Sequence, residues 1–356
     1  MRKHTLFTLS ILLALVLGAC APTPTLAPPT PTAVPATPTP EPTPVPEAAH
    51  ITAYISPDAL AAALEEAFEA ERGDVLTVVS GPWCRKLKAE MEAGDIQADV
   101  IYGAEPLFYL TLKEAGQLME YVSPEAAHIK PEFALDETCF TLANGRYAVI
   151  VYNKKKVDLA EAPATFEDLT DPRWKGKVAI PDATLCASAF AITCGIVQPD
   201  LDWTFFEGVK ANEAMLADRC VAVAQMVAPG EALVGLVPHD AVLRMQKKAK
   251  KEGKESPLAL VWPEDGAISV PRPVAIIKDE ERSEAATKLA QEFVDFILSA
   301  KGQKMAVKFG FVPVREGVPL PEGVPEEIKA ITVDWAWAQE HKKEIRKGFE
   351  SIMYGE

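Results

Sequence analysis

Hydroxyl side chains stand at three points where an apolar, strand-like run of the chain gives way to a helical pattern. Ser56 and Ser80 occupy the first two points, and Thr184 with Ser188 occupies the third. A helix N-terminus offers unpaired backbone N–H groups and the positive end of the helix dipole, and both favour an anion. Ligands of α/β proteins bind at the carboxyl ends of the strands, where these residues fall. The pattern therefore predicts a site for a small anionic solute.

Residues beside the first two points extend this candidate site. Gly81 and Trp83 follow Ser80 and are expected to contact the ligand, whereas Tyr54 is either a ligand contact or a packing residue. The serines either contact the ligand or cap their helices, and one hydroxyl can do both.

The elements that must position these residues alternate along the chain. Strand-like runs cover 50–55, 75–79, 98–102, 146–153, 177–180, 221–226, 232–237, 258–262 and 270–277. Helical patterns cover about 57–72, 85–93, 106–115, 184–193, 241–252, 284–298 and 333–352. Repeated strand, turn and helix predict an α/β fold with a mainly parallel sheet.

The first residues have the composition of an export signal. Arg2-Lys3 precedes an apolar run that ends in Leu17-Gly18-Ala19-Cys20, and this run is shorter than the ~20 residues of a membrane-spanning helix. Leu17-Gly18-Ala19-Cys20 resembles a bacterial lipobox, which implies a signal peptide over 1–20 and lipidation of Cys20. The alternative is an ordinary secretory signal in which Cys20 is incidental.

A Pro- and Thr-rich segment follows over residues 21–47 and holds eleven of the chain's 30 prolines. Such a segment buries too little apolar surface to fold, so we expect a disordered tether. The remaining residues, 48–356, have the length of two domains. The formal net charge of −15 argues against nucleic-acid binding.

Five cysteines follow the predicted lipidation site: Cys84, Cys139, Cys186, Cys194 and Cys220. Outside the cytoplasm they allow two disulfides and one free thiol, with a connectivity that spacing does not reveal, and their spacings match no zinc motif. Cys84 falls at a predicted helix N-terminus, a position that lowers a thiol pKa. The alternatives are structural disulfides or buried thiols on one side, and capture of a soft ligand or metal on the other.

Several short stretches, each weak alone, occur together in one order. They are Tyr54-Ile55-Ser56, Ser80-Gly81, Ala98-Asp99-Val100, Val151-Tyr152-Asn153, the run from Leu169 to Val178, Gly230-Glu231, Pro263-Glu264-Asp265-Gly266, Ser299-Ala300-Lys301-Gly302-Gln303 and Phe311-Val312-Pro313-Val314-Arg315. In this order the chain resembles bacterial extracellular solute-binding lipoproteins with the type II periplasmic-binding fold, the group that binds ferric ion, phosphonates, sugar phosphates and thiamine.

The resemblance implies two α/β lobes joined by crossing hinge strands, with the ligand between them. Residues 48–142 with 268–318 would form the first lobe, and 143–267 with 319–356 the second lobe with the C-terminal helices. It also implies a protein lipid-anchored outside the cytoplasmic membrane that serves an ABC permease and its ATPase. We expect a monomer without a cofactor.

One departure from the family concerns iron. The ferric-ion binders place two adjacent tyrosines after the Gly-Glu motif, whereas this chain has Pro238-His239-Asp240-Ala241 there and no Tyr-Tyr pair anywhere. Tyrosinate coordination of bare ferric ion is therefore not expected. His239 and Asp240 are either an alternative metal or ligand pair, or a capping aspartate beside a surface histidine.

Two other functions compete with transport. One is a cysteine-dependent cleft enzyme that resembles thiamine-degrading enzymes, with Cys84 as nucleophile and a nearby Glu or Asp as its base. The other is a metal-binding sensory lipoprotein. No paired motif supports the enzyme, so the sequence predicts binding without chemistry, to a phosphonate, a phosphate ester or chelated ferric ion.

Overall fold

The computed structural model describes residues 49–81, 83–135 and 137–355. The predicted signal peptide, Cys20 and the tether over 21–47 lie outside the described residues. The described part is built around one mixed sheet with helices on both faces, which confirms the predicted α/β fold class. No helix in these three ranges is both long and apolar enough to cross a membrane.

The sheet joins two parallel groups of strands through a long antiparallel pair. Its strands are β1 (Ile51–Ile55), β2 (Leu76–Ser80), β3 (Val100–Tyr102), β4 (Thr141–Asn153), β5 (Val178–Pro181), β6 (Met215–Ala217), β7 (Val234–Pro238), β8 (Leu258–Val261), β9 (Ala267–Ile276), β10 (Val312–Pro313) and β11 (Ala330–Ile331). The order is β2-β1-β3-β9-β4-β7-β5-β6, with β8 and β10 paired to β4 and β11 paired to β9. β1 is parallel to β2 and β3, and β5 is parallel to β6 and β7. The antiparallel strands β4 and β9 therefore connect the two groups.

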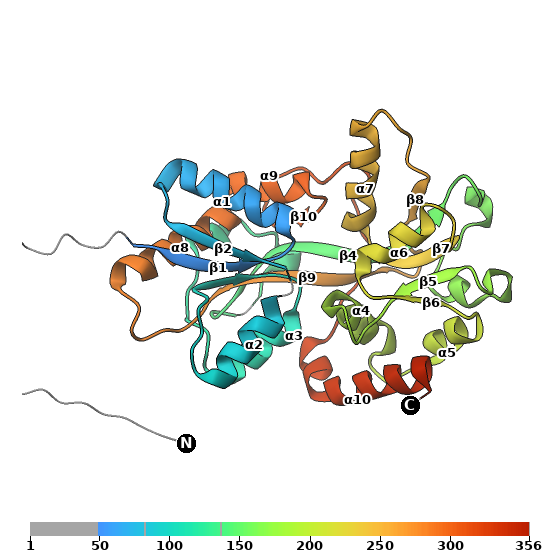
Figure 1. Ribbon diagram of the computed structural model, residues 1–356, viewed down its shortest axis with the longest axis horizontal. Helices are drawn as coiled ribbons and strands as arrows, with labels where there is room; N and C mark the ends of the chain where they lie inside the picture. Colours follow the sequence, from blue (N-terminus) through green and yellow to red (C-terminus); the bar gives the residue numbers. More distant parts are fainter. Residues whose placement is uncertain (1–48, 82, 136, 356) are drawn as a thin grey trace, which may run out of the picture. The chain divides into compact units, whose positions relative to one another are not determined.

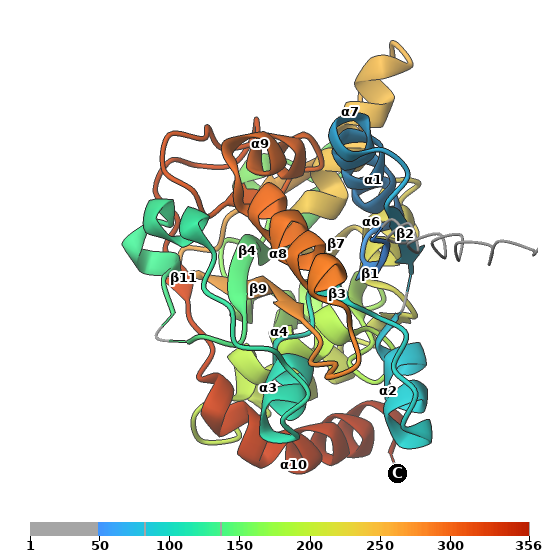
Figure 2. The ribbon, with the colours of Figure 1, turned by 90° about the vertical axis from the view of Figure 1, so that its left-hand side faces the viewer.

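Helices cover both faces of each group. They are α1 (Asp58–Arg72), α2 (Trp83–Ala93), α3 (Pro106–Glu114), α4 (Ala187–Val197), α5 (Thr204–Ala211), α6 (Cys220–Val227), α7 (His239–Lys251), α8 (Glu284–Leu298), α9 (Ala300–Lys308) and α10 (Trp335–Tyr354). Figures 1 and 2 show α1, α8 and α9 on one face of β1–β3 and α2 with α3 on the other. At the other end, α6 and α7 lie opposite α4, α5 and α10 (Figure 1).

The helix α8 forms over the residues that the sequence predicts. Ser283 caps it, because its hydroxyl accepts the N–H of Ala286 at 3.2 Å. Phe293 and Phe296 pack on Phe68 of α1, with ring centroids 4.9 and 5.4 Å apart. Each buried aromatic ring of this kind contributes about 1.5–3 kcal/mol by leaving water. The cluster thus fixes the helices that cover β1 to β3.

The segment predicted as a strand over 221–226 is instead the helix α6, so that prediction is wrong. Its buried residues are Cys220, Val223, Ala224 and Val227. Their spacing of i, i+3, i+4 and i+7 is that of a helix face, which the alternation of valine and alanine obscures in a short apolar run. The helix packs on β5 and β7 and brings Cys220 to the carboxyl edge of the second parallel group.

Candidate functional site

The connecting strands β4 and β9 each carry one arginine, and both arginines face the same side of the sheet. Asn144 lies opposite Arg272 in the register, and Arg146 is two residues beyond Asn144 on the same strand. Because side chains alternate along a strand, Arg146 and Arg272 project to one face. Arg272 is only 2% exposed, and the Arg146 side chain is 11% exposed. Charged groups are costly to bury without partners, so two buried arginines on one face mark it as a candidate binding site.

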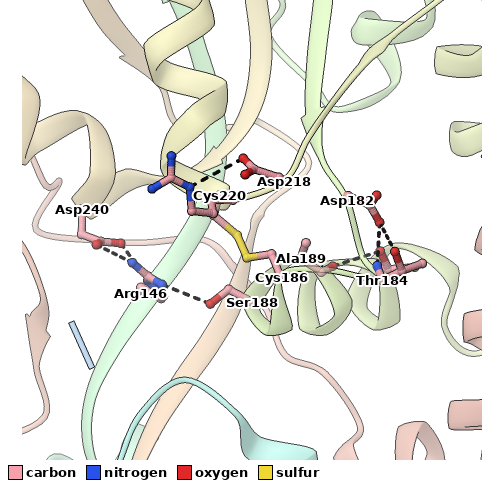
Figure 3. Close-up of a disulfide and its surroundings, with 11 residues drawn as sticks. Arg146, Asp182, Thr184, Cys186, Ser188, Ala189, Asp218, Cys220 and Asp240 are labelled. Atoms are coloured by element: carbon pink, nitrogen blue, oxygen red, sulfur yellow. Dashed lines mark hydrogen bonds and ion pairs between the residues drawn. A yellow bond between two sulfur atoms is a disulfide. The ribbon is translucent and has the colours of Figure 1, made fainter. Parts of the chain in front are cut away.

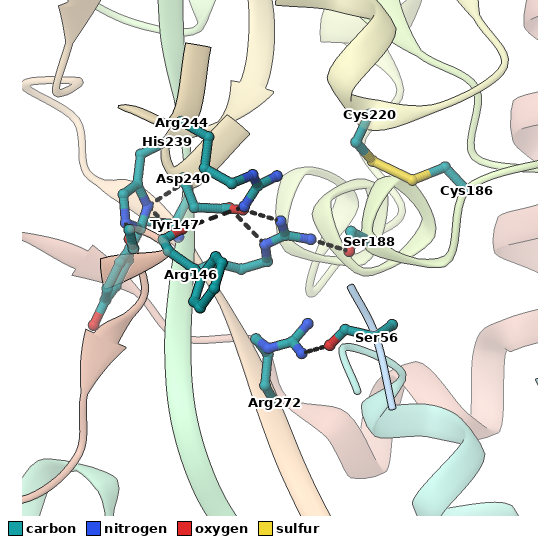
Figure 4. A network of polar contacts seen from close by, with 12 residues as sticks. Ser56, Arg146, Tyr147, Cys186, Ser188, Cys220, His239, Asp240, Arg244 and Arg272 are labelled. Carbon is teal, nitrogen blue, oxygen red and sulfur yellow. Dashed lines mark hydrogen bonds and ion pairs between the residues drawn. A yellow bond between two sulfur atoms is a disulfide. The ribbon is translucent and has the colours of Figure 1, made fainter. Parts of the chain in front are cut away.

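Asp240 lies in the first turn of α7 and holds two of the arginines together. Its fully buried carboxylate accepts a hydrogen bond from Arg146 Nε at 2.8 Å and a second from Arg146 Nη2, and it also pairs with Arg244 one turn along the helix (Figure 4). Burial alone would raise the pKa of Asp240, but the two guanidinium groups outweigh it and hold that pKa well below its usual value. The carboxylate is therefore ionised at physiological pH.

Arg272 is the most deeply buried of the three arginines. Its Nη2 donates to the carbonyl oxygen of Ser56, while its Nε has no hydrogen-bond partner among the described residues. The guanidinium lies over the rings of Phe311, at 4.5 Å, and Tyr102, at 5.1 Å. Cation–π contacts of this kind replace part of the lost hydration. Since these contacts do not use the N–H groups of the guanidinium, the Nε–H of Arg272 could donate to a bound oxyanion.

The cluster carries an excess of positive charge. Three guanidinium groups, of Arg146, Arg244 and Arg272, surround the ring of Phe311 at 5.6, 5.9 and 4.5 Å. Asp240 is the only carboxylate that pairs with them in the described residues. We refer to these four charged residues as the arginine cluster. Three positive charges and one negative charge leave the cluster with a net charge of +2, which favours a bound anion.

Ser188 contacts the arginine cluster from α4, one of the helices that cover the group of strands β5 to β7. It lies in the first turn of α4, and its hydroxyl accepts a hydrogen bond from Arg146 Nη1 at 3.1 Å. No side chain caps this helix at Cys186, so its first N–H groups remain available. A disulfide ties Cys186 to Cys220, and so links the N-termini of α4 and α6 (Figure 3).

Ser56 also reaches the cluster, but through its backbone rather than as a helix cap. The N-cap of α1 is Pro57, which forms no side-chain cap bond, and Ser56 lies one residue before it. The loop that follows β3 approaches closely: a Cβ on Gly103 would lie 3.1 Å from Ser56 Oγ and 2.8 Å from the ring of Trp83. Only glycine fits this point without displacing one of them.

Among the described residues, the other predicted site residues form no hydrogen bond or ion pair with the arginine cluster. Tyr54 is buried in β1 and donates its hydroxyl to Glu90 of α2 at 2.7 Å. Trp83 is buried against Phe108 and Tyr109. Thr184 closes a turn by donating to Asp182 at 2.7 Å, three residues before α4 begins. For Ser80 and Gly81, at the end of β2, no hydrogen bond to the cluster occurs within the described ranges.

His239 is buried rather than on the surface, and it directly precedes Asp240 at the start of α7. Its Nδ1 accepts the N–H of Tyr147 in β4 at 3.0 Å, and its Nε2 donates to the carbonyl of Gly310 at 2.9 Å. Burial lowers the pKa of His239 to about 4, so the imidazole is neutral. In the part of the chain that the structure describes, no group of three His, Cys, Asp or Glu residues could hold a metal ion.

Among the described residues the cysteines form one disulfide, Cys186–Cys220, and the thiols of Cys84, Cys139 and Cys194 are free. Burial, followed by the negative charge of Glu105, raises the pKa of Cys84 far above its usual value. This is the reverse of the lowering that its helix position predicts. Burial also raises the pKa of Glu105 to about 7, against the opposing effects of Cys84 and Arg272. A thiol with a raised pKa is protonated at neutral pH and would react as a nucleophile only if a neighbouring base removed its proton.

The sequence analysis missed the arginines that form the cluster. A signal was present, because Arg146 and Arg272 are single charged residues within strand-like runs of otherwise apolar character. Arg244 gave no such signal, since it lies one turn after Asp240 on a helix rich in charged residues. Its role depends on the burial of Asp240, which only the fold determines.

Comparisons with known proteins identify the family of the chain. The family model described as bacterial extracellular solute-binding protein matches residues 95–341. Iron uptake protein A1 of Synechocystis is 26% identical over 273 residues, which cover 72% of this chain and 73% of that protein.

Two solved structures share the fold. AfuA from Actinobacillus pleuropneumoniae, described with fructose-6-phosphate bound, is 22% identical, with a TM-score of 0.74 over 86% of this chain and 99% of that one. Iron-bound HitA from Pseudomonas aeruginosa is 20% identical, with a TM-score of 0.72 over 85% and 99%. The chain belongs to the bacterial extracellular solute-binding proteins, which bind small solutes outside the cytoplasmic membrane and deliver them to ABC permeases.

Proposed function

We propose that this protein captures a small anionic solute at the arginine cluster and delivers it to an ABC importer. The observation that carries the proposal is the net charge of +2 around Phe311, where three guanidinium groups share the single carboxylate of Asp240. Arg272 adds an unpaired Nε, and the uncapped start of α4 adds free N–H groups. Phosphate, phosphonate and carboxylate oxygens are the acceptors that suit such donors.

The ligand class follows from this chemistry. A phosphate ester, a phosphonate or ferric ion carried by an anionic chelator would each supply several oxygens to the arginines. Bare ferric ion is disfavoured, because the described residues include no cluster of metal-ligating side chains and the sequence has no Tyr-Tyr pair. The related AfuA was described with a sugar phosphate and HitA with iron, so the proposal keeps both a phosphate ester and chelated ferric ion as ligands.

The ligand would lie between two lobes. In this proposal residues 48–142 with 268–318 form one lobe, and 143–267 with 319–356 form the other. Support comes from the sheet order, in which β1 to β3 and β5 to β7 are connected through β4 and β9. Two members of the arginine cluster lie on these strands: Arg272 donates to the Ser56 carbonyl, and Arg146 donates to the Ser188 hydroxyl (Figure 4). A hinge motion about β4 and β9 would close both sides on the ligand.

The proposal places the protein on the outer face of the cell membrane as a monomer. Cys20 would carry the lipid, the segment 21–47 would act as a tether, and a permease with its ATPase would receive the ligand. The support is the lipobox-like Leu17-Gly18-Ala19-Cys20 and the Pro-rich composition that follows it. The enzyme alternative would need Glu105 to deprotonate the thiol of Cys84, because burial raises the pKa of that thiol.

Calorimetry on the purified protein tests the ligand class. Fructose 6-phosphate, methylphosphonate and ferric citrate are the anionic probes, with fructose and spermidine as neutral and cationic controls. Arg272→Gln and Arg146→Gln should each weaken the bound anion by roughly 10- to 100-fold, as expected for loss of a charged hydrogen bond. Arg173→Gln, at an exposed arginine outside the cluster, should leave affinity unchanged. Equal or tighter binding of fructose or spermidine would overturn the proposal.

A further inference from the structure

A pocket lies beside β4 and β9, mainly on the side that faces away from the arginine cluster, and Asn144 of the cluster's side also lines it. Tyr147 and Pro271 line it, and they are the chain neighbours of Arg146 and Arg272. Because side chains alternate along a strand, these neighbours project to the opposite face of the sheet. Figure 4 shows Tyr147 and Arg146 pointing to opposite sides of β4. We call this cavity the back pocket.

The back pocket has the size and the lining of a small-molecule site. Its volume is about 320 Å³, within the range of roughly 300–1,000 Å³ that ligand sites occupy. Three aromatic side chains line it, from Phe133, Tyr147 and Trp335. They come from three distant parts of the chain, and the strand β11 closes one wall with Ala330. Flat aromatic walls favour a flat apolar ligand.

The charges around the back pocket favour a cation. Glu132 and Glu326 line it, and Lys130 is the one basic residue among the described lining residues. The Lys130 ammonium is already engaged, 3.4 Å from the carbonyl of Pro313 and 6.0 Å from the ring of Phe133. Burial and the negative charge of Glu132 together raise the pKa of Tyr147 to about 12, so the field of this carboxylate reaches the floor of the pocket.

We propose that the back pocket is a second binding site and takes a small aromatic molecule that carries one ammonium group. The aromatic part would pack on Phe133, Tyr147 and Trp335, and the ammonium would lie near the two glutamates. Cation–π attraction from the same rings adds to the preference for a cation. This site is separate from the arginine cluster, whose excess positive charge selects the opposite sign.

Tryptamine is a suitable probe, because it joins an indole ring to one ammonium group. Titration of the full-length chain by calorimetry and ligand-observed NMR should give a dissociation constant of roughly 1 mM or below, as expected for a ligand of this size. Indole-3-acetate, which has the same ring and the opposite charge, should bind at least tenfold more weakly.

Variants locate the site. Replacing both glutamates, Glu132→Gln with Glu326→Gln, should weaken tryptamine by roughly two- to tenfold, the range for two exposed charge pairs. Glu327→Gln, at an exposed glutamate outside the lining, is the matched control and should bind as the wild type does. Ala330→Trp, which fills the pocket from β11, should abolish binding.

Three results would overturn the proposal. They are no binding at tryptamine concentrations up to 10-fold above the expected dissociation constant, equal affinity for indole-3-acetate, and unchanged tryptamine affinity in Ala330→Trp. If Ala330→Trp melts early and cannot be used, the paired glutamate variant alone decides, through the ratio of tryptamine to indole-3-acetate affinity. That ratio should fall toward one in the variant and stay unchanged in Glu327→Gln.

Discussion

The buried neutral histidine next to Asp240 should contribute a loss of stability in mild acid. The pKa of His239 falls from 6.5 to about 4 on folding, because burial disfavours the imidazolium. Between these two values the unfolded chain binds a proton that the folded chain does not. Stability from this group is therefore fully present above pH 6.5 and is lost as the pH falls toward 4. Linkage over the interval from pH 7 to pH 5 gives a loss of about 2 kcal/mol.

Urea denaturation followed by tryptophan fluorescence at pH 7 and pH 5 measures this effect. The readout is the difference in unfolding free energy between the two pH values, not the absolute stability, because His239→Gln also alters two hydrogen bonds. The variant should lose about 2 kcal/mol less than the wild type over this interval. His50→Gln, at an exposed histidine, is the control and should follow the wild type. If His239→Gln and the wild type change by the same amount, the reasoning is refuted.

Glu105 should act in the opposite direction and must be separated from the histidine. Burial raises its pKa from 4.5 to about 7, so the folded chain takes up a proton before the unfolded chain does. Its contribution to stability therefore grows as the pH falls from 7 toward 4.5. Glu105→Gln should steepen the acid loss, whereas His239→Gln should reduce it. The opposite signs of these two variants distinguish the two groups.

Three further outcomes follow from the same structure. Asp240→Asn should lower the unfolding free energy by about 3–5 kcal/mol in thermal or urea melts, because it leaves two guanidinium groups without their buried partner. Cys186→Ser with Cys220→Ser should remove about 3–4 kcal/mol, given the sequence separation of 34, and should weaken anion binding measured by calorimetry. Cys20→Ser should release the protein from the membrane fraction, as judged by immunoblotting, without a change in anion affinity. An unchanged melt for either of the first two, or membrane retention of a cleaved Cys20→Ser protein, would contradict the corresponding argument.

The predicted α/β fold depended on features that short stretches of sequence carry well. The 284–298 helix combines a serine cap with a strongly apolar face, and both signals are local. The helix α6 was misassigned because valine and alanine alternate over its eight residues, and alternation is also the signature of a strand. Only the packing of this segment on β5 and β7 distinguishes the two interpretations.

The candidate site was harder to predict because its chemistry comes from residues distant in sequence. Asp240 was named from its place after the Gly-Glu motif, yet its partner Arg146 lies 94 residues away on β4. The burial of Arg272 depends on Phe311, Tyr102 and Ser56, which three separate segments supply. The sequence pointed to helix N-termini, whereas Arg146 and Arg272 lie on the connecting strands and Arg244 lies on α7.

The arrangement of the cluster resolves an apparent conflict between an acidic protein and an anionic ligand. The chain carries a formal charge of −15, which repels an approaching anion at long range. Screening limits that repulsion to about 8 Å at physiological salt, so contacts inside the site decide affinity. Three close arginines would repel one another, and the buried Asp240 offsets that repulsion for two of them. Arg272, held over Phe311 and hydrogen-bonded to Ser56, keeps its charge for the ligand. Because one carboxylate organises the cluster without neutralising it, the site can be ordered before the ligand arrives and still gain from binding an anion.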